Sequence, residues 1–483
     1  MRKLKYGSLL CMVGLLSAGP LQAQDIEKEF EEFERQQLQA FDDFKNKADA
    51  DFETFLRDTW EKFDAFAPVP VPVRPEPPQP VEFDKKKPAL PPVSIKPGKI
   101  KTPETVPYVP VAVEVPVVAP RDIPVRRTAI PFYGASLEVA AGVAEDLTLT
   151  GNKEADVADA WKAICNSDYE QFLSDCLTLK KERRMNDWMY LLFTKQIGEQ
   201  LYGATRTNEI VFLQMFLLNK SGYKVRMAKI DDRLKLMIAT NSTVYAAPYL
   251  TMNGNRYYVF EPDPNGSMGI YTYRQDFADA KNLVALDIAE VPTLDMQEQD
   301  RTLKPTKGSL EVQAVVNKNL IDFYNDYPQC DVVLHYKARM SDELRNSIYP
   351  ALRTAIEGKS QKDAANLLLN FVQTAFEYKT DGEQFGYEKP NFPDETFYYP
   401  YCDCEDRAML YSTLVKDLLG LDTILLDYPN HIASAVRFTD DVTGDYVMLD
   451  DGSKYLICDP TYIGAPVGAC MEQFKEVSPE IIR

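Results

Sequence analysis

The same pattern of helix, strands and hairpin occurs twice in this chain. Residues 208–263 and 404–459 each read as a helix, a glycine near its end, two strands joined by a short turn, and a hairpin that closes on an aromatic-rich strand. The preceding helical segments, DWMYLLFTKQIGEQLYG and NLLLNFVQTAFEYKTDGEQFG, also correspond. Helical periodicity beside short alternating runs is typical of α+β folds. We therefore predict two tandem copies of one α+β unit, over residues 122–300 and 301–483.

The first segment, residues 1–23, has the pattern of a secretory signal peptide. A basic start precedes an apolar run, and the small residue Ala23 stands at the expected cleavage site. We expect an exported protein, located in the periplasm, at the cell surface or secreted. No later segment has the roughly 18 consecutive apolar residues that span a bilayer, so we expect no membrane span.

The balance of charge limits the partners of the exported chain. The predicted signal peptide carries three basic residues and no acid, so its removal takes the formal net charge from −19 to −22. The phosphates of nucleic acids and anionic membrane surfaces repel so acidic a chain. We therefore expect no nucleic-acid partner.

Phenylalanine pairs recur every eleven residues after the signal peptide. The pairs are Phe30/Phe33, Phe41/Phe44, Phe52/Phe55 and Phe63/Phe66. Eleven residues correspond to three turns of about 3.67 residues, which keeps the rings on one stripe of a helix. We predict an amphipathic helix over residues 24–66. Its stripe could form a coiled coil, giving an oligomer or docking an envelope partner, or it could pack back on the body of the protein.

Residues 67–121 form a proline-rich segment. Sixteen of the thirty-three prolines lie between Pro68 and Pro120. Proline at this density excludes helix and central strand, so we predict an extended linker that acts as a spacer. Its last part, VPVAVEVPVV, could instead lie as an edge strand on the body.

A cysteine opens the predicted helix of the second unit. Asp403 is the expected N-cap, Cys404 is the first helical residue, and Gly420 is the expected C-terminal stop. One helical stripe holds Cys404, Ala408, Tyr411, Val415 and Leu418. We therefore expect the cysteine to face the sheet.

An imidazole and a carboxylate fall on the strands that follow. The chain has two histidines, and His431 opens the predicted strand HIASAVRF. Alternation places His431, Ala433 and Ala435 on one face, where the small alanines would let the helix approach. Asp459 lies on the predicted strand KYLICDP, which can pair beside the first strand. Cys404, His431 and Asp459 then form a candidate triad that can generate a thiolate and attack a carbonyl.

The order Cys, His, Asp, with D-C-E-D-R-A at the helix and D-P-T after the last strand, resembles the transglutaminase-like superfamily over about residues 360–465. The resemblance implies a transglutaminase-like (papain-like) core in which Cys404 is the nucleophile, His431 the general base and acid, and Asp459 the orienting group. D-C-E-D is similar to bacterial transglutaminase-like cysteine proteinases, which bind calcium through acids beside the cysteine. Arg407 stands where those proteins usually carry tyrosine, and D-P-T is more similar to the general core. Hydrolysis and transamidation therefore both stay open.

Three acids surround the cysteine in sequence. A helix N-terminus lowers the pKa of a thiol, whereas Asp403, Glu405 and Asp406 would raise it and repel one another. Arg407, helix amides or a hard cation could compensate these charges. Calcium prefers such oxygen clusters, so the three acids are a candidate calcium site, although the thiol chemistry itself requires no cofactor.

In the first unit, Asn208, Arg233 and Glu261 align with the cysteine, histidine and aspartate of the second. Asparagine and arginine cannot act as nucleophile or base, so we predict a degenerate copy. The leading hypothesis is an exported, thiol-dependent acyl-transfer or hydrolytic enzyme, peptidase-like or amidase-like, that acts on a protein or peptide. The alternative is a non-catalytic transglutaminase-like binding or scaffold protein of the cell envelope.

Three further predictions concern the remaining cysteine and histidine side chains. A zinc site from Cys402, Cys404, Cys458 and Cys470 is a weak rival, because the spacing lacks the usual paired motif. A disulfide from Cys402 to Cys458 or Cys470 stays open. His335, in CDVVLHYKA, is expected to be a structural residue of a strand.

Overall fold

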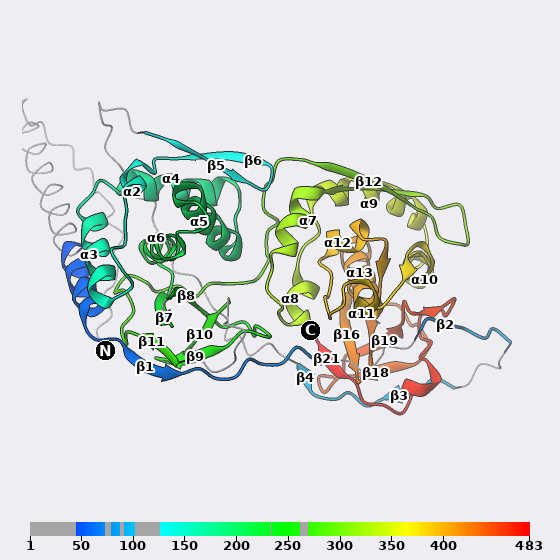
Figure 1. Ribbon diagram of the computed structural model, residues 1–483. Coiled ribbons are helices and arrows are strands. Elements are labelled where there is room, and N and C mark those ends of the chain that lie inside the picture. Colours follow the sequence, from blue (N-terminus) through cyan, green and yellow to red (C-terminus); the bar gives the residue numbers. More distant parts are fainter. Residues whose placement is uncertain (1–44, 73–78, 87–90, 102–125, 232, 261–268) are drawn as a thin grey trace, which may run out of the picture.

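The computed structural model describes residues 45–72, 79–86, 91–101, 126–231, 233–260 and 269–483. The predicted signal peptide and the first two phenylalanine pairs lie outside these residues. The described chain forms two lobes, each with helices packed on a sheet (Figure 1). The fold is therefore mixed α+β, as predicted from the repeated pattern.

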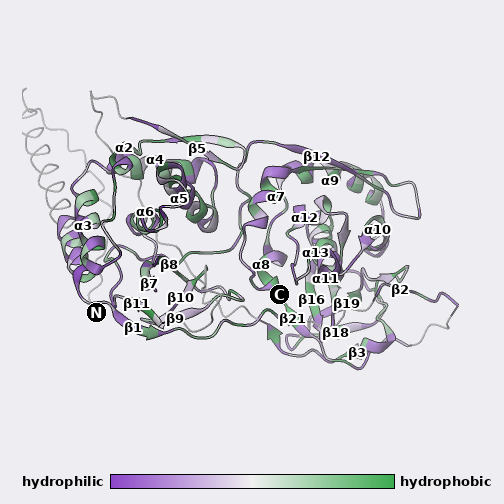
Figure 2. Cartoon of the chain, viewed as in Figure 1, coloured by the Kyte–Doolittle hydropathy of each residue, from purple (hydrophilic) through white to green (hydrophobic). Residues whose placement is uncertain are grey.

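The first lobe contains a sheet with the strand order β1-β11-β7-β8-β10-β9, in which the neighbouring strands are antiparallel. Its strands are β1 (Glu61–Asp64), β7 (Val225–Ile230), β8 (Arg233–Thr240), β9 (Tyr249–Met252), β10 (Asn255–Val259) and β11 (Gly269–Thr272). Its helices are α2 (Gly142–Glu145), α3 (Glu154–Cys165), α4 (Glu170–Glu182), α5 (Asp187–Tyr202) and α6 (Thr207–Lys220), and a separate hairpin consists of β5 (Thr128–Phe132) and β6 (Ala135–Val139). Helices α5 and α6 are largely hydrophobic (Figure 2), as expected for helices buried between other elements.

The second lobe contains a seven-stranded sheet with the order β3-β18-β19-β17-β16-β21-β4. Its strands are β3 (Ser94–Ile95), β4 (Ile100–Lys101), β16 (Asp422–Tyr428), β17 (His431–Arg437), β18 (Tyr446–Met448), β19 (Lys454–Cys458) and β21 (Glu480–Ile482). Its helices are α7 (Lys318–Asn325), α8 (Val332–Lys337), α9 (Asp342–Ile356), α10 (Gln361–Ala375), α11 (Asp381–Gln384), α12 (Pro393–Tyr398), α13 (Cys404–Leu419) and the 3₁₀ helix η1 (Glu472–Phe474). Three short strand pairs complete it: β12 (Glu298–Leu303) with β13 (Val312–Asn317), β14 (Glu377–Tyr378) with β15 (Tyr401–Cys402), and β2 (Val81–Glu82) with β20 (Tyr462–Ile463). The predicted boundary at residue 301 falls inside β12.

The two large sheets share one strand order. In the first lobe α6 leads into β7, β8, β9 and β10, and in the second α13 leads into β16, β17, β18 and β19. In the first sheet the neighbours run β9, β10, β8 and β7, then β11 and the N-terminal strand β1. In the second they run β18, β19, β17 and β16, then β21 and the N-terminal strand β4. The tight hairpins also match, since Ile230 pairs with Arg233 and Tyr428 pairs with His431. This register supports the predicted equivalence of Arg233 and His431.

The N-terminal helix is shorter than predicted at its C-terminal end. The described helix covers residues 45–57, and the chain then forms strand β1 instead of continuing to residue 66. Phe52 is buried against Trp161, Tyr273 and Phe277, with ring centroids 4.8 to 5.6 Å apart. Burial of this aromatic side chain and pairing of β1 with the sheet outweigh the helical periodicity. In the described residues, therefore, the stripe packs back on the body.

The described parts of the proline-rich segment do not extend away as a spacer. Strand β2 pairs with β20, β3 with β18 and β4 with β21, all in parallel. Strands β3 and β4 thereby cover the two edges of the second sheet. Proline tolerates edge positions, and a covered edge resists unwanted pairing. The stretch VPVAVEVPVV lies outside the described residues.

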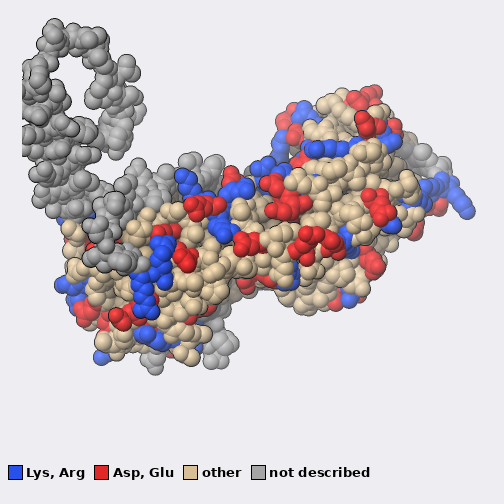
Figure 3. All heavy atoms as spheres, turned by 90° about the horizontal axis from the view of Figure 1, so that it is seen from above, with Lys and Arg blue, Asp and Glu red and all other residues tan. Residues whose placement is uncertain are grey.

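Two observations bear on the expected partners. Among the described residues, no helix is both long and apolar enough to cross a bilayer. On the face shown in Figure 3, acidic and basic side chains are interspersed, and no basic tract covers it.

Candidate functional site

Helix α13 places Cys404 at one end of the central strands. Asp403 and Asp406 form a capping box at its start, and Gly420 ends it with φ 66°. The Ser434 hydroxyl donates to the Ala408 carbonyl at 3.0 Å and fixes the helix on β17. Cys404 precedes Ala408 by about 6 Å along the helix axis. His431 precedes Ser434 by about 10 Å along the strand. Strand β17 is antiparallel to β16, and the short link from Leu419 to Asp422 turns the chain back from α13, which packs on both strands. Cys404 and His431 therefore lie toward the same end of the strands.

The structure brings His431 and Asp459 together. Strands β17 and β19 are neighbours, and His431 Nε2 lies 2.9 Å from Asp459 Oδ2. The amide of Thr461 donates to the other carboxylate oxygen at 2.8 Å and holds it in place. His431 is fully buried and Asp459 is 2% exposed. His431 Nδ1, the nitrogen that would serve the thiol, has no hydrogen-bond partner.

The prediction that Ala433 and Ala435 of β17 face helix α13 is wrong. Ala433 and Ala435 pack in the hydrophobic cluster on the face away from α13, whereas Ile432 packs with Ala408 and Ser434 bonds to the helix. The His431 ring stacks on Phe474, with centroids 5.1 Å apart, and so belongs with the alanines at the end of the strand. His431, Ala433 and Ala435 do share one face, as alternation predicted. The small residue on the face that packs against α13 is Ser434, whose hydroxyl has a buried hydrogen-bond partner there.

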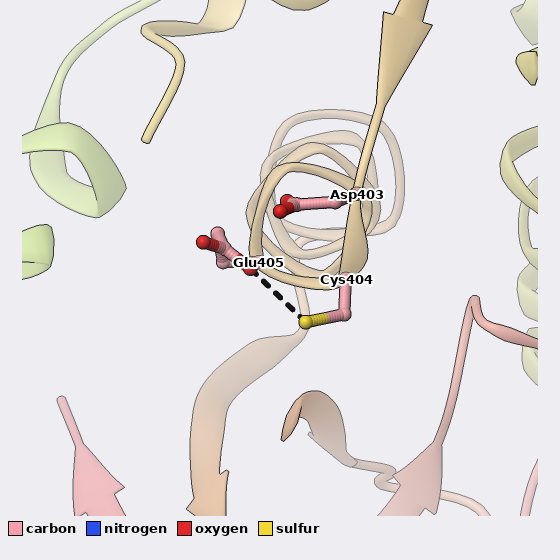
Figure 4. Close-up of side chains that lie close together, drawn as sticks. All are labelled: Asp403, Cys404 and Glu405. Atoms are coloured by element: carbon pink, nitrogen blue, oxygen red, sulfur yellow. Dashed lines mark hydrogen bonds between the residues drawn. The ribbon is translucent and has the colours of Figure 1, made fainter. Parts of the chain in front are cut away.

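Cys404 has an acidic partner. Its sulfur is fully buried and donates to Glu405 Oε2 at 3.0 Å. Figure 4 shows the Glu405 side chain reaching the sulfur, while the Asp403 carboxyl lies across the helix head. The described state therefore pairs the thiol with Glu405 and the imidazole with Asp459.

The acids beside Cys404 belong to a larger buried cluster. Asp403, Glu405 and Asp406 are joined by Asp381 and Glu388, and all but Glu388 are at most 3% exposed. Within each of three groups from this set, one including Cys404, the candidate ligand atoms lie within 4.8 Å of one another. The sequence prediction missed Asp381, which opens the short helix α11, and Glu388, which lies in the loop after it. The capping-box pattern around Asp381 marks only a helix start.

Burial and mutual repulsion favour the protonated form of these acids. Burial, followed by the charge of Asp406, raises the pKa of Asp381 to about 10. Burial, followed by the charge of Glu405, raises the pKa of Asp406 to about 7 and that of Asp403 well above its usual value. Without a compensating cation, the cluster must therefore hold protons at neutral pH.

Amide groups compensate part of this charge. Asn391 donates its main-chain and side-chain N–H groups to Asp406 at 2.8 and 2.7 Å, and the Lys389 amide donates to Asp381 at 2.6 Å. Arg407 donates to the carbonyls of Gln373 and Phe376. Compensation of the acids by the charge of Arg407 stays a prediction.

One carboxyl oxygen of the cluster, Asp403 Oδ1, is buried without a hydrogen-bond partner. A partner-less acceptor among closely spaced carboxyl groups suits a cation. These buried acidic groups could therefore hold a metal ion.

The other cysteines form neither a disulfide nor a metal-ligand group among the described residues, and His335 lies in a helix. All seven described cysteines are free thiols, so no disulfide joins Cys402 to Cys458 or Cys470. Among the described residues, no group of candidate metal ligands combines these cysteines with one another. His335 lies in helix α8 and not in a strand, 3.6 Å from the sulfur of Cys330.

The first lobe lacks the chemistry of the second at the equivalent position. Asn208 lies at the head of α6 and accepts from the Leu234 amide at 3.0 Å, so the helix head contacts the start of β8 directly. Arg233 is exposed as the first residue of β8. Glu261 lies outside the described residues.

Comparison with models of known families, with curated proteins and with solved structures gives no match. The similarity to the transglutaminase-like superfamily therefore stays at the level of the motif residues and their order along the chain.

Proposed function

We propose that this protein is a thiol-dependent acyl-transfer or hydrolytic enzyme, peptidase-like or amidase-like, that acts on a protein or peptide. Cys404 is the nucleophile, His431 the general base and acid, and Asp459 the group that orients the imidazole. The observation that carries the proposal is the buried His431–Asp459 pair, whose second ring nitrogen has no partner, at the end of the strand under the helix headed by Cys404.

The two nitrogens of the imidazole fit separate tasks. Asp459 on Nε2 fixes the orientation of the ring, which leaves Nδ1 to take a proton from a thiol. The helix N-terminus at Cys404 favours a thiolate, and its main-chain amide is a candidate donor to a developing oxyanion. Reaction then requires the Cys404 side chain to leave Glu405 and meet Nδ1.

Access is the second requirement of the proposal. The candidate nucleophile and base are fully buried, and the Phe474 ring covers His431. A substrate can reach the sulfur only after a neighbouring segment moves. We therefore take the described conformation as the closed state of the enzyme.

We propose calcium as the cation of the acidic cluster, held by Asp403, Glu405 and Asp406 together with Asp381 and Glu388. Within each group the candidate ligand atoms lie within 4.8 Å of one another, close enough for oxygen ligands at about 2.3–2.6 Å to reach one ion. When bound, calcium would supply the positive charge that these carboxylates lack. The thiol chemistry itself needs no cofactor.

The alternative is a non-catalytic transglutaminase-like binding or scaffold protein of the cell envelope. It is favoured by the closed site, by the Cys404–Glu405 contact, and by a first lobe that has the same sheet without the thiol or imidazole. The same fold can support unrelated functions, so the reactivity of Cys404 has to distinguish the two proposals.

Alkylation of Cys404 by iodoacetamide tests the proposal, with labelled sites mapped by mass spectrometry. Burial raises the pKa of Cys402 to about 11 and of Cys165, Cys458 and Cys470 to about 12, so these thiols should react slowly at pH 7. We expect preferential labelling of Cys404 at pH 7 that His431→Ala abolishes. His335→Ala is the matched control and should leave the rate unchanged. If Cys404 labels no faster than the other thiols and His431→Ala has no effect, the scaffold alternative stands.

A further inference from the structure

A cavity of about 410 Å³ lies where the two lobes and the N-terminal segment meet. Its wall includes Pro72 from the N-terminal segment, Tyr245 from the first lobe, and Tyr387 and Tyr428 from the second. Tyr387 is 51% exposed, which is unusual for an aromatic ring, whereas Tyr428 is 3% exposed. The cavity is therefore an aromatic pocket with an open rim.

The charge of this pocket is negative. Its wall holds five carboxyl groups, those of Asp331, Glu388, Glu395, Asp427 and Glu480, and two amines, those of Lys101 and Lys389. Each amine is already paired, Lys101 with Asp427 at 3.4 Å and Lys389 with Glu395 at 2.5 Å. Glu388 also belongs to the proposed calcium cluster, and without it the remaining four acids against two bases leave a formal excess of two negative charges. Such a wall selects for a cation.

Polar atoms without partners belong to the same wall. The hydroxyl of Tyr324 and the Nδ1 atom of His335 are buried without a hydrogen-bond partner, and the two side chains are 2% and 8% exposed. Both atoms can accept a hydrogen bond. An N–H donor that reaches them would satisfy acceptors that the described chain leaves unpaired.

The pocket adjoins the candidate catalytic residues. Tyr428 lines it and stacks beside His431, with ring centroids 6.4 Å apart. The adjacent residue Pro429 also lines it, in the turn that leads to His431. A peptide anchored here would have its neighbouring main chain within a few residues of the imidazole.

We infer that this pocket binds a cationic side chain, a lysine ammonium or an arginine guanidinium, of the protein or peptide substrate. Aromatic rings attract cations through their faces, and the acidic wall adds long-range attraction. The inference that the bound peptide is a substrate rests on the proposed function. Binding of the cationic side chain does not.

Fluorescence anisotropy with labelled alanine peptides tests the pocket. The probes carry a central arginine, lysine, glutamine or glutamate, and the protein carries Cys404→Ala so that no chemistry follows. We expect the arginine and lysine peptides to bind at least about tenfold more tightly than the glutamine peptide, and the glutamate peptide to bind most weakly.

Two variants locate the binding. Glu480→Lys reverses a charge in the wall and should weaken the arginine peptide about tenfold, and Tyr387→Ala should weaken it about threefold. Glu476→Lys, an exposed position outside the wall, makes the same change in net charge and should have less than a twofold effect. Thermal unfolding of each variant verifies that it is folded.

Equal binding of the arginine and glutamine peptides, equal effects of Glu480→Lys and Glu476→Lys, or no saturable binding would overturn the inference. Competition by free argininamide as strong as by the peptide would overturn the role in presenting a substrate, because the occupant would then be a small cation. None of these results depends on alkylation of Cys404. Failure of the pocket and failure of the proposed catalysis are therefore distinguishable.

Discussion

The two lobes use one sheet order for different chemistry at the head of the central helix. In the first lobe, Asn208 bonds to the amide of Leu234 and ties the helix to the strand. In the second, the equivalent end holds Cys404 and a His431 ring whose Nδ1 has no partner. The end of the sheet that holds a neutral amide in the first lobe thus holds a thiol and an imidazole in the second. The comparison shows that the fold itself requires neither the cysteine nor the histidine at this position.

The acids of the two helix heads differ in the same way. Glu209 in the first turn of α6 pairs with Arg206 at 2.9 Å. The first turn of α13 instead gathers Glu405 and Asp406 into a cluster of buried carboxyl groups. A paired acid is a common way to stabilise a helix start, whereas several carboxyl groups buried side by side repel one another, which costs free energy and needs a protein-specific reason.

The largest expected effect separates the lobes by reactivity. Cys404→Ala should abolish the acyl-enzyme burst with p-nitrophenyl acetate, and His431→Ala should lower the rate about 10²- to 10⁴-fold, because the general base is lost. Arg233→Ala, at the equivalent position of the first lobe, should change the rate less than about twofold. A comparable loss in Arg233→Ala would show that the two sites are not functionally distinct.

Calcium should stabilise only through the second lobe. At a hundredfold excess over its dissociation constant it should add about 2.7 kcal/mol, or about 5 to 10 °C in Tm for a domain of this size. Scanning calorimetry with calcium and with EDTA measures the shift. Asp403→Asn should remove it, while Glu209→Gln in the first lobe should retain it. A shift that survives Asp403→Asn would place the ion elsewhere.

The pH dependence sharpens the same contrast. Without calcium, the folded cluster keeps protons that the unfolded chain releases near pH 4, since the pKa of Asp406 is raised to about 7 and that of Asp381 to about 10. The folded state then binds more protons, so the stability contributed by the cluster falls as pH rises from about 4 to 7 and above. In EDTA, Tm should decrease by a few degrees between pH 5 and pH 8. Asp406→Asn should flatten this dependence, and a rising Tm for the cluster transition would contradict it.

The smallest effect concerns the contact between helix and strand. Ser434→Ala removes the hydrogen bond to the Ala408 carbonyl and should cost about 0.5–1.5 kcal/mol in urea unfolding. The register of the hairpins makes Leu236 the equivalent residue of the first lobe, where packing replaces this bond. Thr251→Ala, at an exposed position of β9, serves as the control. No change in Ser434→Ala would show that the hydroxyl bond does not position α13.

Local signals predicted the elements that carry the candidate site. Helix α13 begins at Cys404 and ends at Gly420 as its caps indicate, and the start of β17 at His431 also follows from the sequence. The neighbouring positions of His431 and Asp459 followed from the hairpin order. Caps, alternation and turns act within a few residues, so the sequence displays them directly.

Tertiary contacts decided what the sequence could not show. The end of the N-terminal helix depends on burial of Phe52 and on pairing of β1 with β11. The proline-rich segment pairs with strands hundreds of residues later in the chain. Asp381 reaches the acids of α13 from the short helix α11, whose capping pattern indicates a helix start and not a ligand. Each of these outcomes depends on a partner that local propensity does not specify.

The contact between Cys404 and His431 tests the central claim most directly. The chain has two histidines, and burial lowers the pKa of His335 to about 3, so His335 should be neutral at pH 7. NMR of the ¹⁵N-histidine-labelled protein therefore isolates His431. The account predicts that Cys404→Ala shifts the His431 Nδ1 resonance and leaves the His335 resonances in place, because the thiol and this nitrogen meet when the site opens. Identical His431 resonances in both proteins would contradict it.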